Sequence, residues 1–455
     1  MNRVTLNDLY LDEVKRSGAT ARELIGRQAE SAMQNAFYKG QYLSRPLFLG
    51  ADECQQLYAD LECLRAALVS LPDRLYGGDL AAFSRAVGMA DVQISAILRS
   101  RGITVTKQSR ADLYIDETGR FRLLEFNMGS GLGGMDNSDI ARTMLEHPVL
   151  AEFAETHSLT FADTLREQVN NTRVESGFGP GSRPMMVITD WPSSFKVMEP
   201  YMRHYVRRFG ENGFDADACH IGQLEVRDER VWLGDRPVDI INRLFMLEDL
   251  LEYPDAPALM DPILDAAHRG WVKFFTPMDA GLFSAKGALA MLSDEENRSR
   301  FTAGELASMD RILPWTRMVR PGPVTLEDGR RVDLLDYALA HRRDLALKPT
   351  ALHGGHGILL GWTKDTTDQM WEEQVRAALD GPYILQRRIQ PVPEMFPGED
   401  GEPVPWIVAW GAFTVVNGYG GVFARASTVE SNVEVINVAG GAHVGSCLHV
   451  RPDAG

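Results

Sequence analysis

One short stretch constrains the fold more than any other part of the chain, because it predicts two strands joined by a tight turn. Residues 110–127 contain the segment ADLYID, a turn of sequence ETG, and the segment FRLLEFN. Two short strand-like segments around a glycine turn are the signature of a β-hairpin. We therefore expect the side chains of Asp112, Glu125 and Asn127 on neighbouring strands.

Before this hairpin, apolar residues recur with the period of a helix. In ECQQLYADLECLRAALVSL, the leucines at 57, 61, 64 and 68 mark one apolar stripe, as expected of an amphipathic helix. We interpret residues 1–99 as a helical N-terminal region with a structural role.

The sequence pattern after the hairpin predicts further structural units. A Gly/Pro/Ser-rich stretch at 175–184 is the best linker candidate. After it, strand-like and helical segments alternate from MMVITD to VDIINRLF, which predicts a small α/β domain. From about residue 280 we expect a helix, then a strand, glycine-rich loop and strand in DLALKPTALHGGHGILLGW, the strand YILQRRI, and a β-meander in WIVAWGAFTVVNGYGGVFARAS.

Length and charge exclude several classes of protein. A chain of 455 residues is too long for one ordinary core, so several packed subdomains are expected. The formal charge of -16 would repel a nucleic-acid backbone, although a small phosphate site needs only a few local cations. The four scattered cysteines have no zinc-like spacing. A polar N-terminus and the lack of an apolar run of about 18 residues predict a cytoplasmic protein without membrane contact.

Two groups of residues point to chemistry. Arg110, Asp112, Glu125 and Asn127 bring oxygen donors and a cation to one hairpin. Mg²⁺ prefers such ligands and usually bridges to phosphates, and the arginine is suited to a phosphoryl group that is being transferred. The alternative is a solvated hairpin with scattered charges.

The second group is Lys348 with the loop His353, Gly354, Gly355, His356 and Gly357. Glycine turns let backbone N–H groups approach phosphate oxygens, and a lysine at the strand end adds a charge. The spacing matches neither a P-loop nor the GxGxxG turn. A glycine-rich hairpin without a ligand is the alternative.

The order of these groups resembles that of the circularly permuted ATP-grasp superfamily, of which glutathionylspermidine synthetase is a familiar relative. In the usual arrangement the lysines precede the metal-binding Glu-x-Asn, whereas here Glu125 and Asn127 precede Lys348. The resemblance implies a mixed α/β (α+β) fold with four parts: the helical region 1–99, a metal-binding part 100–180, the small central α/β domain 183–275, and a nucleotide-binding part 276–455.

The same resemblance implies roles for individual residues. Asp112, Glu125 and Asn127 would hold Mg²⁺, and Arg110 and Arg425 would stabilise the transferred phosphoryl group. The residues that would bind ATP are Lys286, Lys348, the lid residues His353, Gly354, Gly355 and Gly357, and the adenine hinge Leu385 and Gln386. The chain departs from the family at the hinge, where Gln386 is followed by arginine rather than glutamate. It also departs in a long separation of the two lysines, which suggests an insertion at 294–331.

The implied activity is ATP-dependent ligation of a carboxylate to an amine through an acyl phosphate, with release of ADP and phosphate. Arg243 is a candidate to bind a substrate carboxylate, and Asp136 and Asn137 are candidates to bind the amine. Amino acids, peptides or polyamines are the substrate classes that the resemblance suggests. Phosphotransfer to a stable acceptor, or nucleotide binding without catalysis, are the alternatives.

Overall fold

The computed structural model describes residues 1–26, 36–102, 104–352 and 356–451. Helices account for 43% and strands for 25% of the chain, so the predicted mixed α/β class is confirmed. No helix within these described ranges is long and apolar enough to cross a membrane.

Helices dominate the N-terminal region, as the sequence predicts, but a strand interrupts them. The helices are α1 (Arg3–Ser17), α2 (Ala21–Ile25), α4 (Ala51–Val69), α5 (Leu71–Tyr76), α6 (Leu80–Ala86) and α7 (Asp91–Ser100). The unpredicted strand β1 (Leu47–Leu49) pairs in parallel with β22 (Cys447–Val450), which also pairs with β4 (Leu159–Thr160). The N-terminal region therefore shares a sheet with the last strand of the chain.

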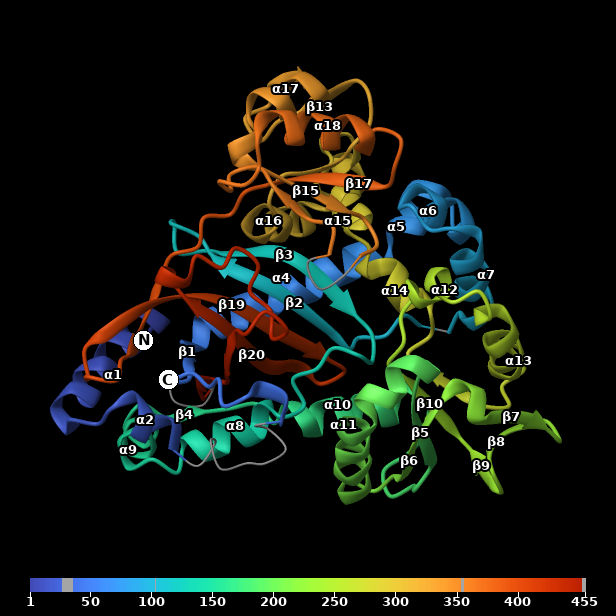
Figure 1. Cartoon of the computed structure of the whole chain (residues 1–455), viewed down its shortest axis with the longest axis horizontal. Helices are drawn as coiled ribbons and strands as arrows, with labels where there is room; N and C mark the ends of the chain where they lie inside the picture. Colours follow the sequence, from blue (N-terminus) through green and yellow to red (C-terminus); the bar gives the residue numbers. More distant parts are fainter. Residues whose placement is uncertain (27–35, 103, 353–355, 452–455) are drawn as a thin grey trace.

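An antiparallel sheet, here called the central sheet, occupies the middle of the molecule (Figure 1). Its strands, in spatial order, are β21 (His443–Gly445), β20 (Gly418–Thr428), β19 (Pro403–Val415), β2 (Ser109–Ile115) and β3 (Phe121–Met128), and β18 (Glu394–Pro397) pairs with β19. The predicted hairpin of residues 110–127 is confirmed as β2 and β3. On one face of this sheet Ala111, Leu113 and Phe126 are buried in one apolar cluster with the leucines of α4.

A parallel sheet lies in the unit formed by residues 185–275, here called the small unit, at the lower right of Figure 1. Its strands are β11 (Lys273–Phe275), β10 (Ile240–Arg243), β5 (Met185–Asp190) and β6 (Asp215–His220). It is accompanied by the helices α11 (Pro192–Glu211), α12 (Asp249–Glu252) and α13 (Ala256–His268), by η2 (Ile221–Gln223), and by the ribbon β7 (Leu224–Arg227), β8 (Arg230–Leu233) and β9 (Arg236–Val238). Every residue of β5 is buried, as its continuous apolar run MMVIT predicts. The helices α8 (Asn137–Met144), α9 (Pro148–Thr156) and α10 (Thr164–Glu175) connect this unit to the central sheet.

A second antiparallel sheet, here called the lysine sheet, lies above the central sheet in Figure 1. Its strands are β12 (Thr316–Met318), β17 (Tyr383–Arg387), β15 (Leu345–Pro349) and β16 (Leu359–Leu360). The elements that precede or connect these strands along the chain are α14 (Asp279–Ser284), α15 (Lys286–Ser293), η3 (Glu295–Arg300), α16 (Ala303–Ile312), β13 (Pro323–Thr325), β14 (Arg331–Asp333), α17 (Leu334–Ala340), η4 (Arg342–Asp344) and α18 (Asp368–Ala378), whereas η5 (Val429–Ser431) follows β20.

The insertion at 294–331 that the lysine spacing suggests stays a prediction, and the segment packs within the fold. It supplies β12, which pairs with β17, and α16, which packs against α4. The four domain boundaries stay predictions, and hydrogen-bonded strands join the first, second and last of the predicted parts.

Gly361 fixes the close approach of two backbone segments at the end of β16. A Cβ atom on Gly361 would lie 1.9 Å from the carbonyl oxygen of Arg342 and 2.9 Å from that of Leu345. We expect Gly361→Ala to lower the free energy of unfolding by about 1–3 kcal/mol, since both contacts are with backbone. Urea unfolding followed by circular dichroism measures the change.

The matched control is Gly304→Ala in α16. Apart from its chain neighbours and the backbone of its own helix, no atom of the described residues lies within 4 Å of a Cβ at this glycine, so alanine should stabilise the helix by about 0.5–1 kcal/mol. Equal unfolding midpoints for the two variants would contradict the steric account of Gly361.

Candidate active site

A charged cluster lies on the open face of the β2–β3 hairpin. Arg110 and Asp112 lie two residues apart on β2 and so point to the same face. Asp112 pairs in register with Glu125 on β3, and Arg110 pairs with Asn127. The four side chains that the sequence singles out are therefore together on one face, opposite the buried Ala111 and Phe126.

Asp112 is the centre of this cluster. Its carboxylate, on a residue that is 4% exposed, accepts hydrogen bonds of 2.8 and 3.0 Å from Nε and Nη2 of Arg110. Arg425, on β20, places Nη2 2.7 Å from Oδ1 of Asp112. Asn127 donates from Nδ2 to Oε1 of Glu125 over 3.2 Å. Although burial disfavours a charged guanidinium, Asp112 and then Glu125 raise the pKa of Arg110 above its usual value.

Gly411 on β19 leaves room for the side chain of Arg110 beside Asp112. It lies in register between Asp112 on β2 and Phe423 on β20. A Cβ atom at this position would lie 3.1 Å from Cδ of Arg110 and 2.9 Å from the carbonyl oxygen of Phe423. The sequence analysis missed this residue. The available signal was a glycine inside a strand pattern, which often marks a close approach.

The two predicted lysines reach the same place, Lys286 from α15 and Lys348 from the lysine sheet. Lys286 is the first residue of α15, and its Nζ lies 3.3 Å from Oε2 of Glu125. The same Nζ donates to the carbonyl oxygen of Leu352 over 2.6 Å. Lys348, on β15, donates from Nζ to Oε1 of Gln386 over 2.6 Å.

Both lysines are almost fully buried, with exposures of 2% for Lys286 and 7% for Lys348. Burial, followed by repulsion from Lys286, lowers the pKa of Lys348 to about 8, and Glu125 opposes this shift. With Arg110 and Arg425, these lysines give the cluster more cations than carboxylates. The surplus positive charge suits a polyanionic ligand.

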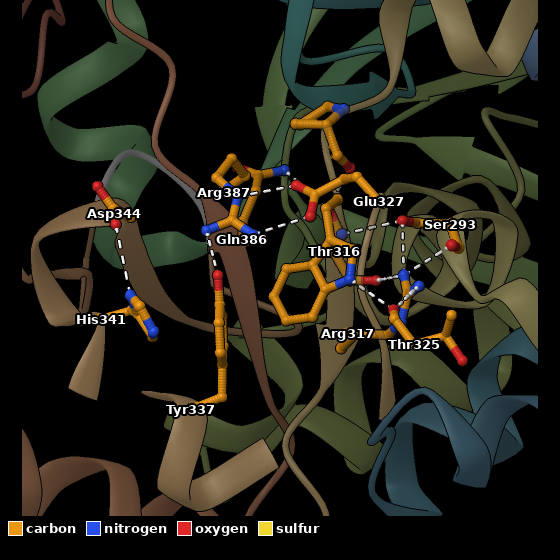
Figure 2. Close-up of polar contacts among 12 residues, drawn as sticks. Ser293, Thr316, Arg317, Thr325, Glu327, Tyr337, His341, Asp344, Gln386 and Arg387 are labelled. Carbon is orange, nitrogen blue, oxygen red and sulfur yellow. Dashed lines mark hydrogen bonds and ion pairs between the residues drawn. The ribbon is translucent and has the colours of Figure 1, made fainter. Parts of the chain in front are cut away.

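The hinge strand β17 is only partly arranged as predicted. Gln386 points to the cluster and holds Lys348, but Leu385 is 0% exposed and packs in the apolar cluster behind the sheet. Both edges of β17 are paired, with β12 and with β15, so the backbone of Leu385 is already used. Figure 2 shows Arg387 turned to Glu327 and Tyr337, to both of which it donates hydrogen bonds.

The remaining predicted residues lie outside the cluster or outside the described ranges. Gly357 has a φ of 69° and packs on Pro349. The lid residues His353, Gly354 and Gly355 lie outside the described residues. Arg243 is 4% exposed, and its guanidinium donates to the carbonyl oxygens of Thr276, Phe245 and Pro277. Its described donors are thus engaged by the fold rather than directed at the cluster.

Asp136 and Asn137 lie near the small unit, away from the charged cluster. Asp136 accepts a hydrogen bond of 3.2 Å from the Tyr38 hydroxyl and lies 3.5 Å from Nε2 of His204. Asn137 donates from Nδ2 to the hydroxyl of Thr164 over 3.0 Å. These contacts connect the small unit to the N-terminal region.

The cavity beside the cluster is narrow. It has a volume of about 130 Å³ and is bordered by Asp112, Glu125, Lys348, Gln386 and Arg425. A larger cavity of about 670 Å³ lies beyond the hinge, around Trp315, Arg317 and Arg387, where the arginines already bind Glu327 and backbone carbonyls (Figure 2). We assign the chemistry to the narrower cavity because it is bordered by the buried Lys348 and by Arg425, whose Nε has no hydrogen-bond partner among the described residues.

The oxygen donors are compatible with a magnesium ion that also binds phosphate. Among the described residues, no cluster of three or more His, Cys, Asp or Glu side chains forms a complete metal site. Asp112 and Glu125 provide two carboxylates, and Asn127 provides an amide. Mg²⁺ typically takes one or two carboxylates and completes its shell with water and phosphate oxygens.

Comparison with known proteins gives the fold. No known protein family and no curated protein matches the chain in sequence. The chain is similar in structure to a glutathione synthetase-like effector from Globodera pallida, with a TM-score of 0.55 and 10% identity over 98% of this chain and 94% of that chain. A D-alanyl-alanine synthetase A from Vibrio cholerae gives a TM-score of 0.28 and 10% identity over 56% of this chain and 70% of that chain. The first likeness shows a shared fold, and the second is too low to support a conclusion.

The lowered pKa of Lys348 gives a test with inorganic triphosphate. Above pH 8 the free lysine is increasingly neutral, whereas a bound polyanion favours its protonated form. Binding near pH 8.5 should therefore take up protons, and affinity should fall by up to about tenfold per pH unit above 8. Calorimetry in buffers of different ionisation enthalpy measures the uptake. Lys348→Met should bind more weakly and without this uptake, and uptake that persists in Lys348→Met would contradict the assignment.

Proposed function

We propose that this chain is an ATP-grasp enzyme that ligates a carboxylate to an amine, using ATP and Mg²⁺. The observation that carries the proposal is the meeting of Asp112, Glu125 and Asn127 with Lys286 and Lys348 at one cleft. The fold likeness to a glutathione synthetase-like effector supports it. The order of these residues along the chain supports the circularly permuted branch.

In this proposal Asp112, Glu125 and Asn127 would hold the magnesium ion. The ion would neutralise phosphate charge while the γ-phosphoryl group is transferred. Asp112 is held in place by Arg110 and Arg425, so its position is fixed before a nucleotide arrives. Asn127 would turn its amide oxygen to the metal in place of the contact with Glu125.

The cations of the cluster would bind and orient the phosphates. Lys286 and Lys348 would contact the phosphates of ATP, and Arg110 and Arg425 would stabilise the group in transfer. A substrate carboxylate oxygen attacks the γ-phosphorus, and the bond to the ADP oxygen breaks. The amine nitrogen then attacks the acyl carbon, phosphate leaves, and the nitrogen loses a proton. Positioning and charge supply most of the catalysis in such transfers.

Adenine would bind between Gln386 and the apolar side chains of Leu360 and Ile389, which border the same cavity. The cavity volume of about 130 Å³ is below the range of about 300–1,000 Å³ that ligand sites usually have. The lysine sheet would therefore move away from the central sheet to admit a nucleotide.

Substitution of the metal ligands tests the metal assignment. We expect Glu125→Gln and Asn127→Ala each to lower Mg²⁺-dependent ADP release by about 10–100-fold, because each removes an oxygen donor or its charge. Higher Mg²⁺ should restore part of the rate. Glu117→Gln, in the exposed turn of the same hairpin, should keep full activity. Unchanged ADP release in both ligand variants would refute the assignment.

Hydroxylamine distinguishes ligation from phosphotransfer. An acyl phosphate should react with hydroxylamine to give a hydroxamate that requires ATP, Mg²⁺ and the carboxylate substrate. Amino acids and peptides are the first carboxylates to screen, with amino acids and polyamines as amines. A phosphorylated acceptor that persists when amine is added would favour a kinase instead. Nucleotide binding without any ADP formation would favour a non-catalytic module.

A further inference from the structure

A third cavity adjoins the small unit, and its described lining shares no residue with the cavity beside the charged cluster. It has a volume of about 250 Å³ and lies at the carboxyl ends of β5 and β10, against α11 and the loop that follows β3. Crevices at the carboxyl ends of parallel strands are common ligand sites.

The loop that follows β3 connects this cavity to the charged cluster. Gly131 and Gly133 border the cavity, while the carbonyl oxygen of Leu132, between them, accepts a hydrogen bond from Nη1 of Arg110. A ligand in the cavity therefore lies directly behind the loop that Arg110 holds. This position suits a substrate that reacts at the cluster with a second substrate, which has been phosphorylated there.

Hydrogen-bond acceptors dominate the polar part of the cavity. Within the described part of the chain, Oδ1 of Asn242 and Oε1 of Gln108 have no hydrogen-bond partner, and these residues are 6% and 2% exposed. Asp190, 8% exposed, uses Oδ1 to accept from the backbone N–H of Trp191. Buried acceptors without a donor are costly, so a ligand that brings N–H groups would satisfy them.

The cavity also carries negative charge that no cation in its described lining balances. Its described lining contains Asp190 and no lysine, arginine or histidine. Burial raises the pKa of Asp190 to about 6, and the nearby Asp249 adds to the shift. Arg243, on the adjacent strand β10, is turned to backbone carbonyls instead. A buried carboxylate in this setting favours a cationic partner.

Apolar side chains form the rest of the wall. Ile188, Met198, Phe209 and Leu244 border the cavity, and they offer a surface for methylene groups. The hydroxyls of Tyr201 and Tyr205 form a hydrogen bond with each other. The lining thus combines an apolar wall with an acidic end.

We propose that this cavity, here called the amine pocket, binds the protonated end of an aliphatic amine substrate through Asp190, Asn242 and Gln108, and rejects carboxylates. The inference rests on the proposed ligase function for its biological meaning, since it assigns the class of the amine. The substrate then carries two amino groups: one attacks the acyl phosphate as a neutral amine, and the other is held as an ammonium ion.

Calorimetry with probes of one chain length tests the pocket without ATP. The full chain is titrated with 1,4-diaminobutane, 1-aminobutane, 4-aminobutanoate and succinate. We expect the two amines without a carboxylate to bind, and the two carboxylate-bearing probes to bind at least about tenfold more weakly, because Asp190 repels them. Equal affinity for diaminobutane and succinate would overturn the proposal.

Two variants and a control locate the binding. Asp190→Asn should weaken diaminobutane binding by about 10–100-fold, and Asn242→Leu by a smaller factor of about 3–10. The control Asp215→Asn, at the other end of the same parallel sheet, should bind like the unchanged protein. Circular dichroism checks that the variants fold. If Asp190→Asn does not fold, Asn242→Leu still decides the test.

The outcomes separate this inference from the proposed function. Amine binding that depends on Asp190, in a protein that forms no amide, would support the pocket and refute the ligase. Hydroxamate formation in a protein that binds neither amine would support acyl phosphate chemistry and overturn the pocket. Unchanged diaminobutane binding in both pocket variants would also overturn it.

Discussion

The site depends on one buried carboxylate that two guanidinium groups share. Asp112 binds Arg110 on its own strand and Arg425 on β20. An ionised carboxylate that is 4% exposed is stable only when it is paired. The pairing in turn orients both arginines towards the cleft, where they would otherwise repel each other. The contacts of Asp112 that link β2 to β20 in the central sheet therefore also fix the positive charge of the site.

This local arrangement reverses the charge of the chain as a whole. The formal charge is -16, yet the cleft brings together two arginines and two buried lysines. The two lysines are held by protein oxygens that a phosphate oxygen can replace, namely the carbonyl oxygen of Leu352 and Oε1 of Gln386. Anion binding would thus exchange one set of acceptors for another rather than order mobile side chains, which reduces the entropic cost.

Sequence alone was sufficient where structure follows from neighbouring residues. The β2–β3 hairpin and the buried strand β5 carry their own strand and turn signals, so both were predicted. The approach of Lys286 to Glu125 has no local signal, because it joins α15 to the hairpin, and only the resemblance in motif order suggested it.

The strand β1 is three residues long and pairs with a strand at the far end of the chain. Propensity cannot indicate a pairing of that kind. Gly411 and β12 were missed for the same reason, since their roles depend on neighbours distant in sequence. The three polar residues assigned to the amine pocket, Gln108, Asp190 and Asn242, also come from three separate segments of the chain.

The order of strands in the central sheet has a consequence for synthesis on the ribosome. The hairpin β2–β3 emerges early, but its neighbour β19 and the Arg425 strand β20 follow only after most of the chain has been made. Until then, β2 presents an unpaired edge, and Asp112 lacks one of its two cations. The parallel partner of β1, which is β22, emerges later still. A nascent chain must therefore keep two open edges from joining other chains until β19 and β22 have been made.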